Sequence, residues 1–110
     1  MSEKRQAIYF KDTTTGKEPA KDWIQSMRDN MGKAKIFTRI SRAEDGNFGD
    51  HSSVGNGVFE LRIDFGPGYR VYYGLEGSDL IILLIVGDKS SQVKDINKAK
   101  EFWASHKSEK

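Results

Sequence analysis

The sequence feature that most constrains the fold lies in residues 58–73, where two alternating segments flank a glycine-rich turn. Apolar and polar side chains alternate through residues 58–65, and the apolar ones are Phe59, Leu61, Ile63 and Phe65. The turn Gly66-Pro67-Gly68 follows, and residues 69–73 alternate again, with Tyr69, Val71 and Tyr73 on one face. A period of two is typical of a strand with one buried face. This stretch therefore predicts a β-hairpin with strands at 58–65 and 69–73.

The segment before the hairpin predicts one strand and a helical hairpin. Residues 7–10 are short and β-prone, and Pro19 is suited to the first turn of a helix. The first helical stripe contains Ala20, Trp23, Ile24, Met27 and Met31. After a break near Asn30 and Gly32, a second stripe contains Ile36, Phe37, Ile40 and Ala43, and Gly46 is the expected stop. Residues 47–56 are expected to form a loop.

The segment after the hairpin predicts a central strand and a last helix. Residues 80–86 are apolar at every position, as expected of a strand covered on both faces. Ser90 or Ser91 is the expected cap of the helix, whose packing face contains Val93, Ile96, Ala99 and Trp103. The expected order is β-α-α-β-β-β-α, an α+β fold with a small, mainly antiparallel sheet.

Length and composition narrow the class of protein. The 110 residues suit a single domain spanning 1–110. The absence of cysteine removes disulfides and thiolate chemistry, and a formal charge of only +2 does not by itself indicate a nucleic-acid binder. His51 and His106 lack metal-ligand spacing, so no metal or cofactor is expected. The longest apolar run is far shorter than a membrane helix, which favours a cytoplasmic protein.

The candidate chemistry lies on the polar face of the hairpin. If the turn centres on Gly66, Arg62 lies opposite Arg70 and Glu60 lies opposite Tyr72. Two like charges in that position are unfavourable, which suggests an anion between them, and guanidinium groups match phosphate oxygens. Tyr72 would stack a base or hydrogen-bond a phosphate, and Lys89 would add a charge from the end of the next strand.

The same residues also have a purely structural interpretation. Arg62 has Glu60 and Asp64 on its own face, so these three side chains could form a solvated ladder of ion pairs. A lone histidine in a loop, such as His51, is more often a surface residue than a base. Asp88 could cap the last helix as easily as take part in chemistry. The residue pattern alone leaves both interpretations open.

Residues 58–73, together with Leu83-Leu84, residues 87–92 and Asp95-Ile96, resemble the addiction-module killer proteins. These are phage-derived toxins of the HigB branch of the RelE/ParE superfamily. The resemblance implies a RelE-like fold and the toxin of a type II toxin–antitoxin module, neutralised by a small helix-turn-helix antitoxin in a hetero-oligomer. It also implies a metal-independent endoribonuclease that cuts mRNA on the ribosome and so inhibits translation. In that reaction the 2′-hydroxyl attacks the adjacent phosphorus.

The resemblance also assigns roles to single residues. Arg70 matches the arginine that holds the scissile phosphate, and Arg62 matches a basic residue on the preceding strand. Lys89 falls where a basic residue stabilises charge or protonates the leaving 5′-oxygen. His51 corresponds to a histidine used by HigB-type toxins, and Asp88 lies near another polar position of that branch.

This chain departs from the family at two positions. Glu60 stands where RelE-type enzymes have a lysine, and Asp95 stands where they have a tyrosine. The general base is therefore unassigned, with His51, Asp88 and Tyr72 as candidates. Two alternatives to the nuclease stay open: a ParE-like inhibitor of DNA gyrase, and a decayed toxin that only binds its antitoxin.

Overall fold

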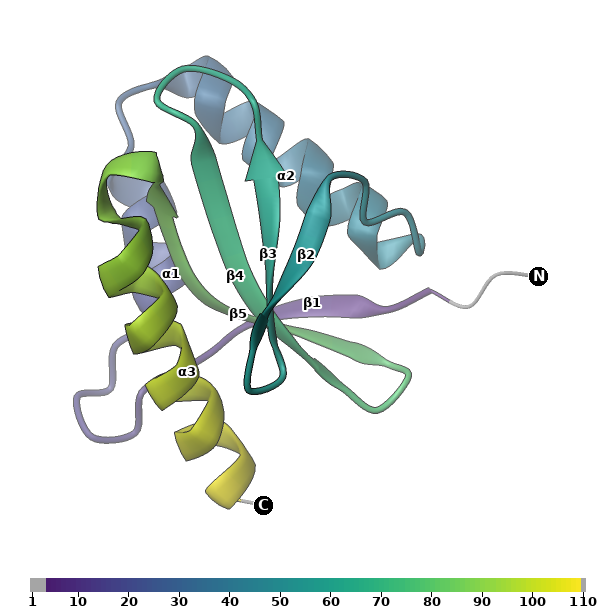
Figure 1. Ribbon diagram of the computed structural model, residues 1–110, viewed down its shortest axis with the longest axis vertical. Coiled ribbons are helices and arrows are strands. Elements are labelled where there is room, and N and C mark those ends of the chain that lie inside the picture. Colours follow the sequence, from purple (N-terminus) through teal and green to yellow (C-terminus); the bar gives the residue numbers. More distant parts are fainter. Residues whose placement is uncertain (1–3, 110) are drawn as a thin grey trace.

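The computed structural model describes residues 4–109 and has five strands and three α-helices in that part of the chain (Figure 1). The elements follow one another as β1 (Gln6–Tyr9), α1 (Pro19–Ser26), α2 (Asn30–Glu44), β2 (His51–Gly55), β3 (Val58–Ile63), β4 (Tyr69–Glu76), β5 (Leu80–Asp88) and α3 (Gln92–Ser108). A 3₁₀ turn, Lys89–Ser91, joins β5 to α3. The α+β class predicted from the sequence is confirmed.

The five strands form one mixed sheet in the order β1-β5-β4-β3-β2. β1 runs parallel to β5, and the other neighbouring strands are antiparallel. Helices α1 and α2 cover one face of this sheet and α3 covers the other, so the molecule has three layers (Figure 1). No helix within residues 4–109 combines the length and the apolar character needed to cross a membrane.

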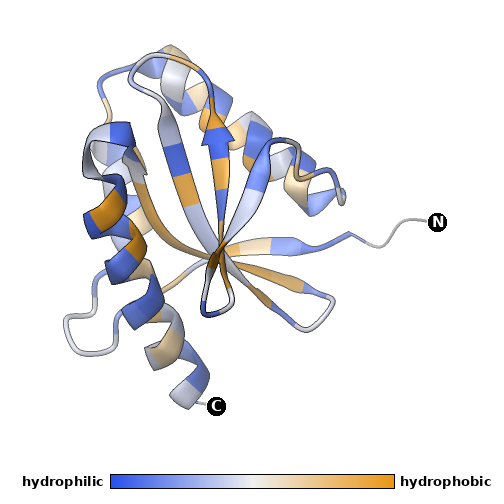
Figure 2. Cartoon of the chain, viewed as in Figure 1, coloured by the Kyte–Doolittle hydropathy of each residue, from blue (hydrophilic) through white to orange (hydrophobic). Residues whose placement is uncertain are grey.

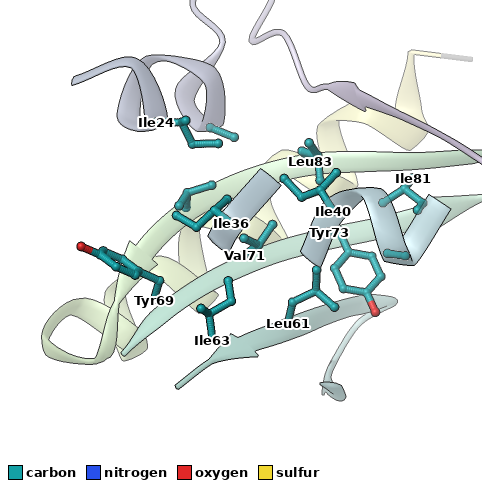
Figure 3. Packing of buried hydrophobic residues seen from close by; sticks show 13 residues of the cluster. Ile24, Ile36, Ile40, Leu61, Ile63, Tyr69, Val71, Tyr73, Ile81 and Leu83 are labelled. Atoms are coloured by element: carbon teal, nitrogen blue, oxygen red, sulfur yellow. The ribbon is translucent and has the colours of Figure 1, made fainter. Parts of the chain in front are cut away.

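The larger core lies between the sheet and the first two helices. Ile24 of α1 and Ile36 and Ile40 of α2 pack on the inner face of β3, β4 and β5 (Figure 3). The sheet residues labelled there are Leu61, Ile63, Tyr69, Val71, Tyr73, Ile81 and Leu83. The alternation predicted for both strands of the hairpin is thus confirmed, because the predicted inner residues share one face.

The smaller core lies under α3. Its helix residues are Ala99, Phe102 and Trp103, which pack on Val58, Tyr72, Ile82 and Leu84. β5 contributes to both cores and is apolar along most of its length (Figure 2), as expected of a strand covered on both faces. The tight fit at Gly74 shows how close α3 approaches, since a β-carbon there would lie 2.5 Å from the Trp103 ring.

Several boundaries follow directly from local chemistry. α1 begins at Pro19, as predicted, because proline loses no helical hydrogen bond in the first turn. The carboxylate of Asp29 caps α2 by accepting a hydrogen bond from the Gly32 amide at 2.9 Å. Gly46 follows α2 with a φ of 91°, the left-handed conformation expected of a glycine that ends a helix.

Four predictions about the elements were wrong. Residues 51–55 form an edge strand, β2, where a loop was expected, so the order has one more strand than predicted. Val93 is 76% exposed, because the packing face of α3 is turned towards Phe102 instead. Met31 belongs to the first turn of α2 and is 65% exposed. Phe37, expected on the packing stripe of the second helix, is 45% exposed. Trp23, by contrast, packs against the larger core as its stripe predicted, partly buried and edge-on to Tyr69.

Candidate anion-binding pocket

An open pocket lies at the end of the sheet where β3 turns into β4. Its volume is about 290 Å³, at the lower end of the range for small-ligand sites. Three cationic residues and two acidic residues border it: Arg62, Arg70, Lys89, Asp50 and Asp64. The turn residues Gly66, Pro67 and Gly68 complete its wall. The pocket therefore gathers charge from two strands, β3 and β4, from the residues just before β2 and just after β3, and from the segment after β5.

The turn itself makes room for the pocket. Gly68 has a φ of 81°, a conformation that favours glycine. A β-carbon at Gly68 would lie 3.2 Å from Cδ of Lys89 and 3.5 Å from Nη1 of Arg70. The missing side chain thus lets both cations approach the turn.

The predicted register of the hairpin is confirmed. Arg62 is paired with Arg70, and Glu60 is paired with Tyr72. The two arginines therefore stand side by side on adjacent strands, on the face of the sheet that α3 covers. Their guanidinium groups nevertheless have very different surroundings.

The guanidinium of Arg62 has a partner for each of its donor nitrogens. Nε and Nη2 donate to Oδ1 of Asp50 at 3.0 and 2.7 Å, and Nη1 donates to Oε2 of Glu60 at 2.8 Å and to the Ser52 hydroxyl at 2.7 Å. Nη2 also lies 3.5 Å from the carbonyl oxygen of His51. Two carboxylates thus neutralise Arg62, so it is not a free ligand for an anion. The structural interpretation was right about Glu60 and wrong about Asp64, because Asp50 is the second partner.

The guanidinium of Arg70 is buried and almost unpartnered. Arg70 is only 7% exposed, although it lies on the polar face of the hairpin, because α3 covers that face here. Its one hydrogen bond within residues 4–109 runs from Nη1 to the carbonyl oxygen of Tyr69 at 3.1 Å, and the buried Nε has no partner. A buried guanidinium is costly unless its N–H groups are satisfied. Arg70 is therefore the candidate donor for an anion in the pocket.

Contacts with α3 explain why Arg70 is buried. Gly87 is the partner of Arg70 on β5, and a β-carbon at Gly87 would lie 2.0 Å from a carboxylate oxygen of Asp95. The Ser91 hydroxyl donates to that same oxygen at 2.6 Å and holds Asp95 in place. The first turn of α3 thus packs directly over this part of the sheet.

Glu60 connects Arg62 to α3. Its side chain is buried, and Oε1 accepts a hydrogen bond from the Gln92 amide at 3.3 Å while Oε2 accepts from Arg62. Glu60 therefore has a structural role here.

The three residues considered as general bases lie outside the pocket. The ring of Tyr72 is fully buried, so it is not accessible to a base or a phosphate, and burial raises the pKa of its hydroxyl. His51 is paired with Leu61 and therefore faces the other side of the sheet, where its ring contacts Phe48. Asp88 is paired with Tyr69 and caps the 3₁₀ turn by accepting from the Ser90 amide at 2.9 Å.

The structure brings two acidic residues to the pocket that the sequence analysis did not propose as site residues. Asp50 precedes β2, and hydrogen bonds from Arg62 hold the pKa of its carboxyl below the usual range. Asp64 follows β3, is exposed and has no hydrogen bond or ion pair to another described residue. Its place in the alternating pattern beside Arg62 was the one signal in the sequence that pointed to it.

The pocket has the donors of an anion site and not those of a metal site. Within the described part of the chain, no three His, Asp or Glu side chains come close enough together to hold a metal ion. Lys89 is exposed at the mouth of the pocket, while Arg70 forms its buried end. Fold and pocket together describe an α+β protein with a small mixed sheet and a candidate anion site.

Comparison with known proteins places this chain in a family. A protein of Haemophilus influenzae, described as an uncharacterized protein, is 54% identical to it over 78 residues. The match covers 71% of this chain and 79% of the relative, so the chain belongs to the same family as that protein. No family model and no solved structure matches the chain.

Proposed function

We propose that this protein is the toxin of a type II toxin–antitoxin module, a HigB-like member of the RelE/ParE superfamily that cleaves mRNA on the ribosome. The observation that carries the proposal is the buried, nearly unpartnered guanidinium of Arg70 at the end of an open pocket. The resemblance of residues 58–73 to the HigB branch supplies the reaction, and the order of the elements is compatible with it.

In this proposal the pocket binds the scissile phosphate of RNA. Arg70 donates to the non-bridging oxygens, whose negative charge grows as the 2′-oxygen attacks phosphorus. Because its donors are already in place and shielded from water, little reorganisation is needed at that moment. Lys89 lies beside Arg70 at the turn and stabilises charge on the phosphate or on the leaving 5′-oxygen. Arg62 positions the edge of the pocket and does not contact the phosphate.

The test is in vitro translation with purified protein, followed by primer extension on the message. The wild-type protein should produce new 5′ ends within ribosome-bound mRNA, and Arg70→Ala should reduce their rate of appearance by about 100-fold or more. Arg28→Ala is the matched control, because Arg28 is exposed and lies outside the pocket. Its cleavage rate should equal that of the wild type.

Two other outcomes would contradict the proposed nuclease activity. Intact message at protein concentrations that arrest growth, together with inhibition of gyrase supercoiling, would favour the ParE-like alternative. Intact message without growth arrest would favour a decayed toxin. If the protein is a nuclease or a gyrase inhibitor, a small helix-turn-helix protein encoded by the neighbouring reading frame should co-purify with it and abolish its toxicity.

A further inference from the structure

We propose that Asp64 is the general base of this site: its carboxylate accepts the proton of the ribose 2′-hydroxyl next to the phosphate held by Arg70. This inference rests on the proposed function and deepens it, because it assigns a residue to the proton transfer that the sequence left without one. It also defines the substrate as a phosphodiester that is flanked by a 2′-hydroxyl.

The position of Asp64 supports this role. It borders the same pocket as Arg70 and Lys89, where the turn leaves β3. It is exposed, and no hydrogen bond or ion pair to another described residue occupies its carboxylate. A general base must be free to reach the proton that it removes, and Asp64 meets that requirement.

The other carboxylates near the site do not meet it. Asp50 borders the pocket, but Arg62 donates two hydrogen bonds to one of its oxygens, and these bonds make the group a weaker proton acceptor. Glu60 is buried and bonded to both Arg62 and Gln92. Asp88 faces the opposite side of the sheet.

The step balances with residues of this chain alone. Asp64 takes the proton from the 2′-hydroxyl, the 2′-oxygen forms a bond to phosphorus, and the bond from phosphorus to the 5′-oxygen breaks. Lys89 gives a proton to that leaving oxygen. The products are a 2′,3′-cyclic phosphate and a free 5′-hydroxyl, and water returns Asp64 and Lys89 to their starting protonation states.

The inference predicts opposite effects of one substitution on cleavage and on binding. Asp64→Asn should reduce the single-turnover cleavage rate of ribosome-bound mRNA by about 100-fold or more, the usual contribution of a general base. The same change removes a negative charge from the pocket, so the affinity for inorganic phosphate, followed by NMR titration, should stay the same or rise. Asp64→Glu should restore part of the rate.

Asp22→Asn is the matched control, since Asp22 is an exposed residue of α1 with the same charge, and it should leave both properties unchanged. Cleavage by Asp64→Asn at the wild-type rate would overturn the assignment and leave the proposed function intact. A parallel loss of phosphate affinity and cleavage would overturn it as well, because it would mark a structural role. If the wild-type protein cleaves no message, the proposed function and the base fail together.

Discussion

Arg62 and Arg70 are direct neighbours on β3 and β4, yet their guanidinium groups are in opposite states. Arg62 is partly exposed and is bonded to Asp50, Ser52 and Glu60. Arg70 is buried and has one hydrogen bond, to a backbone carbonyl. The more exposed arginine, Arg62, thus has a protein partner for each of its donor nitrogens. The buried arginine, Arg70, has donor groups without a partner. The proposed function therefore rests on the unused donors of Arg70 and not on the exposed charge of Arg62.

The largest expected effect is on stability, and it comes from the core between α3 and the sheet face that carries both arginines. Trp103 is buried against Gly74 of β4, so Trp103→Ala should lower the free energy of unfolding by about 3–5 kcal/mol. Urea denaturation measures this change. Val93→Ala on the same helix is the control and should change stability by less than about 0.5 kcal/mol, because Val93 is exposed. A loss below about 1 kcal/mol for Trp103→Ala would show that α3 contributes little to the core.

The difference between Arg62 and Arg70 is tested by replacing each with methionine and measuring stability and phosphate affinity. Arg62→Met should lower stability, because it leaves the buried carboxylate of Glu60 without its cation. Arg70→Met removes a buried, unsatisfied charge, so stability should stay the same or rise by about 1–3 kcal/mol. Phosphate affinity should fall at least about tenfold for Arg70→Met, corresponding to about 1.4 kcal/mol, and much less for Arg62→Met. Equal effects of the two changes on both properties would contradict the distinction.

A smaller effect separates backbone strain from crowding of the pocket. Gly68→Ala and Gly77→Ala each place a β-carbon on a residue with positive φ, and each should cost about 1–2 kcal/mol. Only Gly68→Ala crowds Lys89 and Arg70, since nothing lies within 4 Å of the β-carbon at Gly77. Phosphate binding should therefore weaken in Gly68→Ala alone. Equal binding by both variants would place the anion away from this turn.

The smallest expected effect is on the pH dependence of stability, and it comes mainly from the ion pair of Asp50 with Arg62. Asp50 has a lowered pKa in the folded protein, so its pairing with Arg62 adds stability above its unfolded pKa of about 3.9. That stability is lost as the pH falls through the lower, folded value. Urea midpoints measured from about pH 6 down to about pH 2 should fall less steeply in Asp50→Asn than in the wild type. Arg70→Met should change the slope much less, because Arg70 forms no ion pair with a carboxylate within residues 4–109 and its charge is the smallest of the causes that lower the pKa of Asp50.

The hairpin could be predicted from the sequence to the level of single residue pairs. The period of two selects which side chains share a face, and the turn at residues 66–68 sets which residues are opposite. Arg62 and Arg70 are paired as that reasoning predicts. The two apolar faces of β5 were predicted for a similar reason, because a strand without polar positions must be covered twice.

The states of the two arginines could not be predicted in this way. Ser52 of β2 and Asp50, just before that strand, bond to Arg62. The Ser-Ser segment of β2 and the bulge before Gly55 lack the usual strand pattern. Arg70 is buried because α3 packs at Gly87, a contact between distant parts of the chain. The face of the sheet on which His51 and Asp88 lie likewise depends on which residues they pair with in the neighbouring strands. That register is set only when the whole sheet has formed.

The parallel pairing of β1 with β5 has a consequence for how the protein is made. Gln6 pairs with Leu80 and Tyr9 with Leu83, so β1 leaves the ribosome long before the strand with which it pairs. At typical synthesis speeds of about 5–20 residues per second, the N-terminal strand waits roughly 4–15 s for β5. Contacts between residues far apart in the sequence form late in folding. The chain must lose the conformational entropy of the long intervening loop before such a contact stabilises it. The nascent chain therefore cannot complete its sheet until β5 has left the ribosome.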